Sequence, residues 1–72
     1  MEIEVNDDEL ETFVLWYREQ PLSRWSLCTS VFETCICGHF HTYTKRAVEI
    51  RKRCTELGLI ITHRDGTFEI TI

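Results

Sequence analysis

The chain has 72 residues, 43% hydrophobic and 28% charged, a composition that predicts one folded domain over residues 1–72 and excludes a disordered segment. No apolar run approaches the roughly 18 residues that span a bilayer, so we expect no membrane partner. The acidic first residues are the reverse of a secretory signal, which predicts a cytoplasmic protein whose four cysteines are free thiols.

The charge is distributed unevenly along the chain. Residues 1–22 carry seven acidic side chains and one arginine, whereas residues 23–72 carry seven basic and five acidic side chains. The formal net charge of −4, taken alone, argues against nucleic acid as a partner. The distribution predicts an acidic front and a mildly basic back.

Residues 7–19 have the pattern of an amphipathic helix. Asn6 can cap its first turn, and Glu9 three residues later resembles a capping box. Apolar side chains follow at helical spacing, namely Leu10, Phe13, Val14 and Tyr17. The acids of the first turn stand where the helix dipole favours negative charge, so helix initiation explains much of the acidic front.

Residues 27–36 predict a second helix after a short connection, 21–25, that is also compatible with a single edge strand. Ser26 is suited to the N-cap, and Gly38 to a terminating glycine. Its apolar stripe is expected to contain Cys28, Val31, Phe32 and Cys35, with Leu27 and Ile36 at the flanks.

The two tryptophans, Trp16 and Trp25, are expected in the core or at its edge. An exposed tryptophan would instead point to a protein interface.

Residues 44–57 predict a third helix, with Thr42 or Thr44 as its cap and Gly58 as its terminating glycine. One side of this helix is apolar, since Ala47, Ile50, Cys54 and Leu57 recur at steps of three and four.

Residues 59–72 predict a β-hairpin with Asp65-Gly66 as a two-residue turn. The register that places Arg64 opposite Thr67 gathers one apolar face, made of Leu59, Ile61, Phe68, Ile70 and Ile72. His63 is then expected at the edge of that face as a buried, hydrogen-bonded residue. Because an isolated hairpin is marginally stable in water, its apolar face is expected to pack on the helices.

The stretch KRAVEIRKRCTELGLIITHRDGTFEITI, residues 45–72, resembles the winged helix-turn-helix DNA-binding domain superfamily. The resemblance rests on a basic amphipathic helix that ends in Leu57-Gly58-Leu59-Ile60 and is followed by a hairpin. It implies an α+β fold with three helices and a C-terminal hairpin wing. The order of the expected elements agrees with that fold over nearly the whole chain.

The resemblance also implies a small protein that binds double-stranded DNA as a transcriptional regulator, with helix 44–57 in the major groove and hairpin 59–72 as the wing. The DNA-binding residues that it implies are Thr42, Tyr43, Thr44, Lys45, Arg46, Glu49, Lys52, Arg53 and Arg64.

The spacing of the charges leaves two interpretations of helix 44–57 open. Its four cations, Lys45, Arg46, Lys52 and Arg53, form two pairs seven residues apart, which suits contacts to phosphates. A solvated face with ion pairs Glu49–Arg53 and Lys52–Glu56 would have the same pattern.

The alternative function is a protein-binding adaptor or inhibitor that uses the winged-helix shape without binding DNA. Helix 7–19 is then expected to contact the target protein. For the DNA-binding function, the same helix is the surface expected to pair two copies of the chain in a homodimer.

Cysteines and histidines alternate in one segment, at Cys35, Cys37, His39 and His41. In an extended chain all four would project from one side, and zinc prefers these ligands. However, strict alternation over about 20 Å does not close a tetrahedron, so we expect core cysteines and loop histidines rather than a metal site. We likewise expect no cofactor and no catalytic Cys–His pair.

Overall fold

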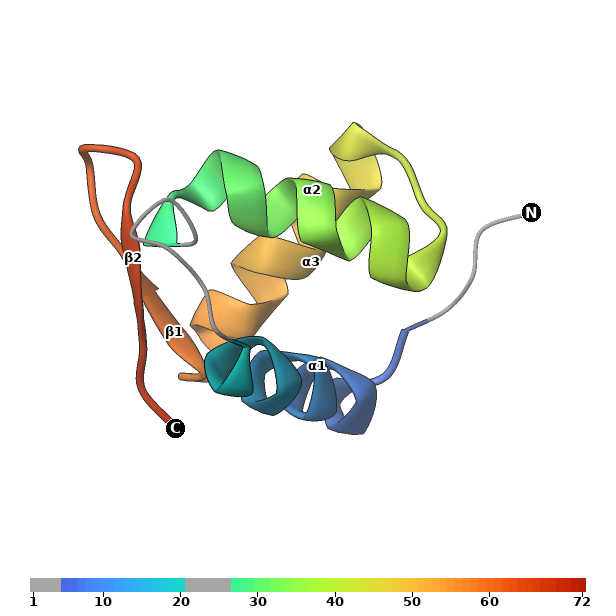
Figure 1. The fold of residues 1–72 in the computed structure, drawn as a ribbon, viewed down its shortest axis with the longest axis horizontal. Coiled ribbons are helices and arrows are strands. Elements are labelled where there is room, and N and C mark those ends of the chain that lie inside the picture. Colours follow the sequence, from blue (N-terminus) through green and yellow to red (C-terminus); the bar gives the residue numbers. More distant parts are fainter. Residues whose placement is uncertain (1–4, 21–26) are drawn as a thin grey trace.

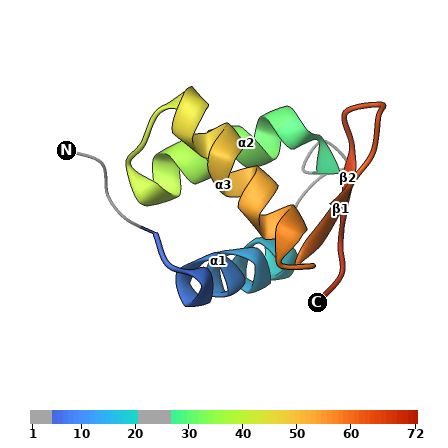
Figure 2. The ribbon, with the colours of Figure 1, turned by 180° about the vertical axis from the view of Figure 1, so that it is seen from behind.

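Three helices and a two-stranded antiparallel hairpin make up the fold in a computed structural model, which describes residues 5–20 and 27–72. The order is α1 (Asp7–Glu19), α2 (Thr29–Phe40), α3 (Thr44–Glu56), β1 (Ile60–Thr62) and β2 (Phe68–Ile70). In Figures 1 and 2, α2 and α3 lie side by side, α1 lies below them, and the hairpin stands at one end. The predicted α+β class, with three helices before a hairpin, is confirmed.

The expected connection at 21–25, the expected cap Ser26 and the expected core residue Trp25 lie outside the described residues.

Helix α1 has the predicted bounds. The backbone N–H of Glu9 donates to Asn6 Oδ1 at 2.9 Å, so Asn6 is the cap. The second half of the expected capping box is missing, because the Glu9 carboxylate makes no hydrogen bond or ion pair within the described residues. The predicted apolar stripe of α1 is fully buried.

Helix α2 begins two residues later and ends four residues later than predicted. Gly38 lies inside the helix, and the left-handed residue that ends it is His41, with φ 53°. The buried stripe of α2 consists of Phe32, Ile36 and Phe40. Of the expected stripe, Cys28, Val31 and Cys35 are only half-buried and Leu27 is exposed.

Packing explains why α2 continues beyond Gly38. The additional turn places the Phe40 ring 5.4 Å from that of Phe13, and Phe40 is buried there. A glycine inside a helix costs about 1 kcal/mol, whereas burying a phenylalanine gains roughly 1.5–3 kcal/mol.

Helix α3 begins at the predicted residue but lacks the predicted cap. Tyr43, not Thr42 or Thr44, occupies the N-cap position, and no side chain caps the first turn. At the other end Gly58 stops the helix as expected, with φ 76°. Its N–H donates to Thr55 O at 3.1 Å and the Leu59 N–H donates to Cys54 O at 3.0 Å, a Schellman motif.

The hairpin register differs by one residue from the predicted register. The partners are Ile60 with Ile70, Ile61 with Glu69, and Thr62 with Phe68. The loop therefore has three residues, 64–66, and it is closed by the His63 N–H donating to Thr67 O at 2.8 Å. Gly66 has φ 87° and Asp65 has no positive φ, as in a three-residue hairpin loop.

This register exchanges two isoleucines between the faces of the hairpin. Ile60 is buried, whereas Ile61, which was expected to face the core, is 49% exposed. His63 is also exposed, and it faces Glu69 at 3.0 Å instead of lying in the core. Leu59 and Phe68 are buried as expected, while Ile70 and Ile72 are half-buried.

An aromatic cluster joins the helices to the hairpin. The Phe32 ring lies 5.6 Å from Phe13, 5.0 Å from Tyr17 and 4.7 Å from Phe68. The hairpin thus closes the core, as the sequence predicts.

The loop of the hairpin is also bonded to the start of α2. The Thr29 N–H donates to Gly66 O at 2.8 Å, and Cys28 forms a β-bridge with Thr67. The position of the hairpin is therefore set at both its apolar face and its loop.

Candidate nucleic-acid interface

The outer side of α3 is the centre of the predicted interface. Ala47, Ile50 and Cys54 turn inward to the core. In Figure 2, α3 lies in front of α2, and no other helix or strand of the described chain covers its outer side. The exposed charges on this side are those of Lys45, Glu49, Lys52 and Glu56.

The first turn of α3 contributes polar side chains to the same region. Thr42 is half-buried, Tyr43 is 53% exposed, and Thr44 and Lys45 are exposed. Among residues 5–20 and 27–72, no side chain caps this turn and the turn itself holds no acid, so no described cap or first-turn acid offsets the partial positive charge of the helix N-terminus.

Arg53 is exposed but paired with an acid of α1. Its Nε and Nη2 donate to the two carboxylate oxygens of Asp7, at 3.1 and 2.9 Å, and Nη1 donates to Glu56 at 3.1 Å. The hydrogen bond to Asp7, followed by that to Glu56, raises the pKa of Arg53 above its usual value. The bidentate contact links the start of α1 to the last turn of α3.

Arg46 is engaged on the same side of α3. Its Nη1 donates to Glu49 at 3.0 Å, and its Nε is enclosed without a partner in the described residues. A crevice between α1 and α3 contains both arginines, together with Val5, Asp7, Leu10, Glu49 and Ile50.

The ion pairs on α3 have a different spacing from those in the sequence interpretation. They join residues three apart, Arg46–Glu49 and Arg53–Glu56, instead of Glu49–Arg53 and Lys52–Glu56.

The basic residues of α3 and the hairpin therefore fall into two groups. Lys45, Lys52 and Arg64 are exposed and pair with no acidic side chain in the described ranges. Arg46 and Arg53 form ion pairs with carboxylates of this chain, those of Glu49 and Asp7. Arg51 joins α3 to α2, since its Nε donates to Glu33 at 2.6 Å and each side chain is 18% exposed.

The loop of the hairpin offers one cation, Arg64, beside an ionised acid. The hydroxyl and the N–H of Thr67 both donate to Asp65 Oδ1, at 2.6 and 3.0 Å. These bonds, the hydroxyl first, lower the pKa of Asp65. Asp65 thus stabilises the loop that presents Arg64.

The cysteine–histidine segment is helical, which separates its side chains. Alternate residues of a helix lie about 200° apart, so Cys35 and Cys37 do not share a side of α2. Among residues 5–20 and 27–72, no group of three or more His, Cys, Asp or Glu side chains is placed to hold a metal ion.

The thiols of Cys35 and Cys54 are poor nucleophiles in this structure. Burial raises the pKa of Cys54 to about 11 and raises that of Cys35 as well, and the thiolate is the reactive form.

Trp16, expected in the core or at its edge, lies at the edge and is partly open to solvent. Trp16 is 46% exposed, although its ring stacks on Phe13 with centroids 5.8 Å apart and lies 5.6 Å from His39. Its position off the apolar stripe of α1 is the signal in the sequence that could have indicated this.

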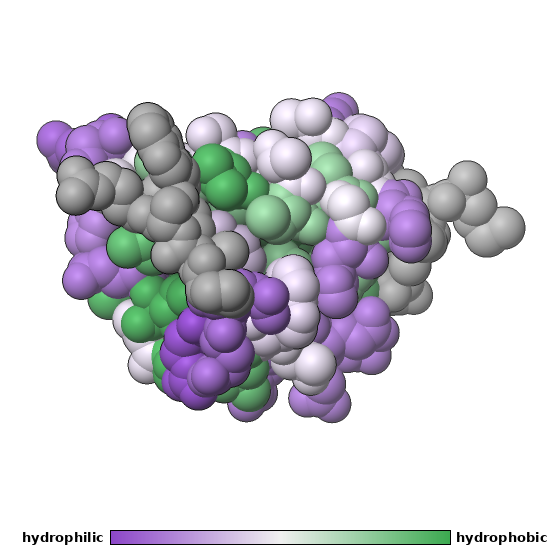
Figure 3. All heavy atoms as spheres, in the orientation of Figure 1, coloured by the Kyte–Doolittle hydropathy of each residue, from purple (hydrophilic) through white to green (hydrophobic). Residues whose placement is uncertain are grey.

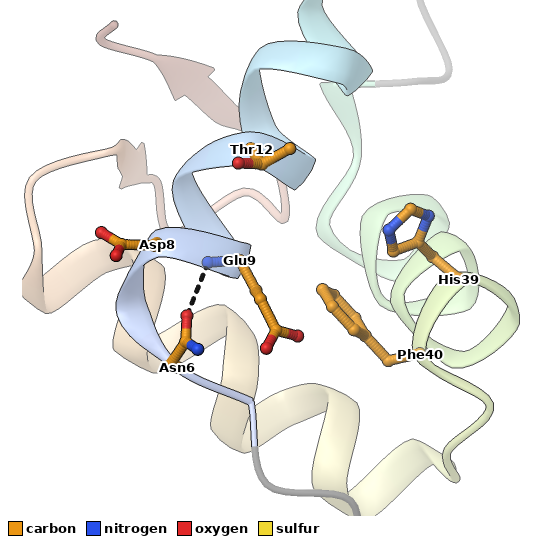
Figure 4. Close-up of a pocket in the computed structure, with 6 residues that line it drawn as sticks. All are labelled: Asn6, Asp8, Glu9, Thr12, His39 and Phe40. Atoms are coloured by element: carbon orange, nitrogen blue, oxygen red, sulfur yellow. Dashed lines mark hydrogen bonds between the residues drawn. The ribbon is translucent and has the colours of Figure 1, made fainter.

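Beside these rings is a groove of about 280 Å³ between the first turns of α1 and the end of α2, shown in Figure 4. We refer to it as the α1–α2 groove. It is lined by Asn6, Asp8, Glu9, Thr12, His39 and Phe40.

No family model matches the chain, and comparison with curated proteins and with solved structures gives no match either. Within the described part of the chain, every helix is too short or too polar to cross a bilayer. The functional proposals therefore rest on the residues of this chain.

Proposed function

We propose that this chain is a small winged helix-turn-helix protein that binds double-stranded DNA and acts in transcription regulation. The observation that supports this function best is the outer side of α3, which no described helix or strand covers and which carries Lys45 and Lys52, two exposed cations that pair with no acid in the described residues. In the hairpin loop Arg64 is a third exposed cation without an acidic partner among those residues.

The spacing of the two lysines suits a DNA groove. Seven residues of helix rise by about 10 Å, comparable with the roughly 12 Å width of the major groove. Lys45 and Lys52 can thus contact phosphates on the two strands that border the groove, while α3 lies in the groove. Tyr43 and Thr44, at the uncapped N-terminus of α3, are placed for contacts to a phosphate or to base edges.

The remaining predicted DNA-binding residues have a different role in this proposal. Arg53 holds α3 against α1 through Asp7, and Arg46 pairs with Glu49 of α3 itself, so DNA would have to displace those acids to reach the two arginines. Glu49, exposed between the two lysines, can accept a hydrogen bond from a cytosine amino group.

The test is the salt dependence of duplex binding. Three phosphate contacts predict a slope of log K against log salt of about −2.7, since each contact contributes about −0.9. Fluorescence anisotropy with a mixed-sequence duplex measures this slope. The double variant Lys45→Gln, Lys52→Gln is expected to weaken binding and to bring the slope to about −0.9.

Arg18→Gln is the control for loss of a cation outside α3, because Arg18 is an exposed residue in the last turn of α1. It is expected to leave the slope nearly unchanged. Equal losses of duplex affinity in the control and in the lysine variant would show non-specific electrostatic attraction rather than an interface on α3. Absence of binding at low salt would sink the proposal and favour a protein-binding adaptor.

A further inference from the structure

The α1–α2 groove has the chemical character of a site for a cation. In Figure 4 the carboxylate of Glu9 and the ring of Phe40 point toward one another across the gap between α1 and α2, while Asp8 points away. The ring of His39 stands next to Phe40, at a centroid distance of 4.7 Å. One wall is therefore a carboxylate and the other wall is aromatic.

The Glu9 carboxylate has no partner within the described part of the chain. Its neighbour Asp7, in the same first turn, is bound by Arg53 in bidentate geometry. Glu9 is also free of the expected capping role, since only its backbone N–H contacts Asn6. Of the three acids in this turn, Asp7 is paired with a cation of the protein, whereas Glu9 faces the groove and is unpaired within the described residues.

The aromatic surface continues from the groove along α1. Glu9 and Trp16 are seven residues apart and share a side of the helix, with Thr12 between them. The His39 ring lies 4.8 Å from Phe13 and 5.6 Å from Trp16, so it joins the groove to the exposed indole. Figure 3 shows this side of the molecule, where hydrophobic and near-neutral atoms over α2 border hydrophilic atoms over α1.

We propose that the α1–α2 groove binds an arginine side chain of a partner protein, with the guanidinium between Glu9 and the rings of Phe40 and His39. Charge complementarity selects a cation, and the flat rings favour a guanidinium, which pairs with a carboxylate and stacks on aromatic faces at the same time. Trp16 packs on an apolar residue of the partner next to that arginine, as exposed aromatic residues at interfaces do. The site is separate from α3 and does not depend on DNA binding.

The probe is the peptide acetyl-Gly-Leu-Arg-Leu-Gly-amide, and the control probe carries citrulline in place of arginine. Citrulline keeps the shape of the side chain and removes its charge. Titration of the whole protein is followed by the NMR shifts of Thr12, His39 and the Trp16 indole. Saturable shifts at these residues are expected, with at least about tenfold weaker binding of the citrulline peptide.

Glu9→Gln is expected to weaken binding of the arginine peptide about tenfold, and Trp16→Leu is expected to weaken both peptides. Glu11→Gln is the matched control, because Glu11 is an exposed acid of α1 that does not line the groove. Amide spectra of all three variants report whether the fold is intact.

The proposal is overturned if Glu11→Gln costs as much affinity as Glu9→Gln, since binding would then follow net charge alone. It is equally overturned if both peptides bind with the same affinity, if the shifts fall on α3 or the hairpin, or if no shift saturates.

Discussion

Gly38 and Gly58 have opposite backbone requirements, which predicts opposite effects of the same substitution. Gly38 lies inside α2 with a helical φ, and a Cβ there would meet nothing within 4 Å. Gly38→Ala is therefore expected to raise the free energy of unfolding by about 1 kcal/mol, the difference in helix propensity. Gly58 has φ 76°, so Gly58→Ala is expected to lower it by about 1–2 kcal/mol. Urea denaturation measures both, and a change of the same sign in the two variants would contradict the assignment.

The same glycines show what the sequence can indicate at the scale of single residues. Gly58 follows a continuous apolar stripe and is followed by two aliphatic residues, and it ends its helix as predicted. Gly38 resembles a stop signal to the same degree. The residue that ends α2, His41, is neither glycine nor asparagine, so the usual terminating signal is absent from that position of the sequence.

At the scale of elements, α2 and α3 are joined by the ion pair of Glu33 and Arg51, in which each side chain is 18% exposed. Removal of one partner leaves a poorly solvated charge, so Glu33→Ala or Arg51→Ala is expected to cost roughly 2 kcal/mol of stability. The double variant is expected to cost little more than either single variant. Chemical denaturation of the four proteins gives this coupling energy.

The exposed pair of Arg18 and Glu19 is the control for that cycle, because surface pairs contribute about 0–1 kcal/mol. Additive losses for Glu33 and Arg51 would show that the two residues do not act as a pair.

The bounds of α1 and the start of α3 could be predicted from the sequence, since periodicity marks both helices strongly. The hairpin could be predicted, but its register could not. Ile60 and Ile61 are both aliphatic, so either register buries one of them. The deciding feature is the pair of hydrogen bonds from Thr67 to Asp65, which stabilises a three-residue loop in place of the two-residue turn.

Helical spacing placed the cations on α3 but could not divide them into two groups. That division depends on where α1 packs, and the acid that binds Arg53 is 46 residues away in the sequence. The groove could not be predicted for the same reason, because its two walls come from α1 and from a turn of α2 beyond the predicted helix.

At the scale of the whole molecule, the two proposed surfaces lie on different sides of the core. The outer side of α3 is in front in Figure 2, whereas α2 lies in front of α3 in Figure 1 and the groove lies between α1 and the end of α2. The cations of α3 that face α1 are already paired with acids. Ion pairs within the protein, Arg46–Glu49 and Arg53–Asp7, therefore lie on the side of α3 that faces α1.

This separation predicts that the two surfaces bind independently. Duplex affinity is expected to change less than about twofold when the arginine peptide saturates the groove, because the two proposed sites share no residue and salt screens the charges of exposed side chains. Glu9→Gln is expected to leave duplex binding intact, and Lys45→Gln with Lys52→Gln to leave peptide binding intact. Anisotropy of labelled duplex, measured with and without peptide, tests the first expectation directly. Mutual displacement would show instead that both ligands bind one surface. The variant that abolishes binding of both duplex and peptide would then identify that surface.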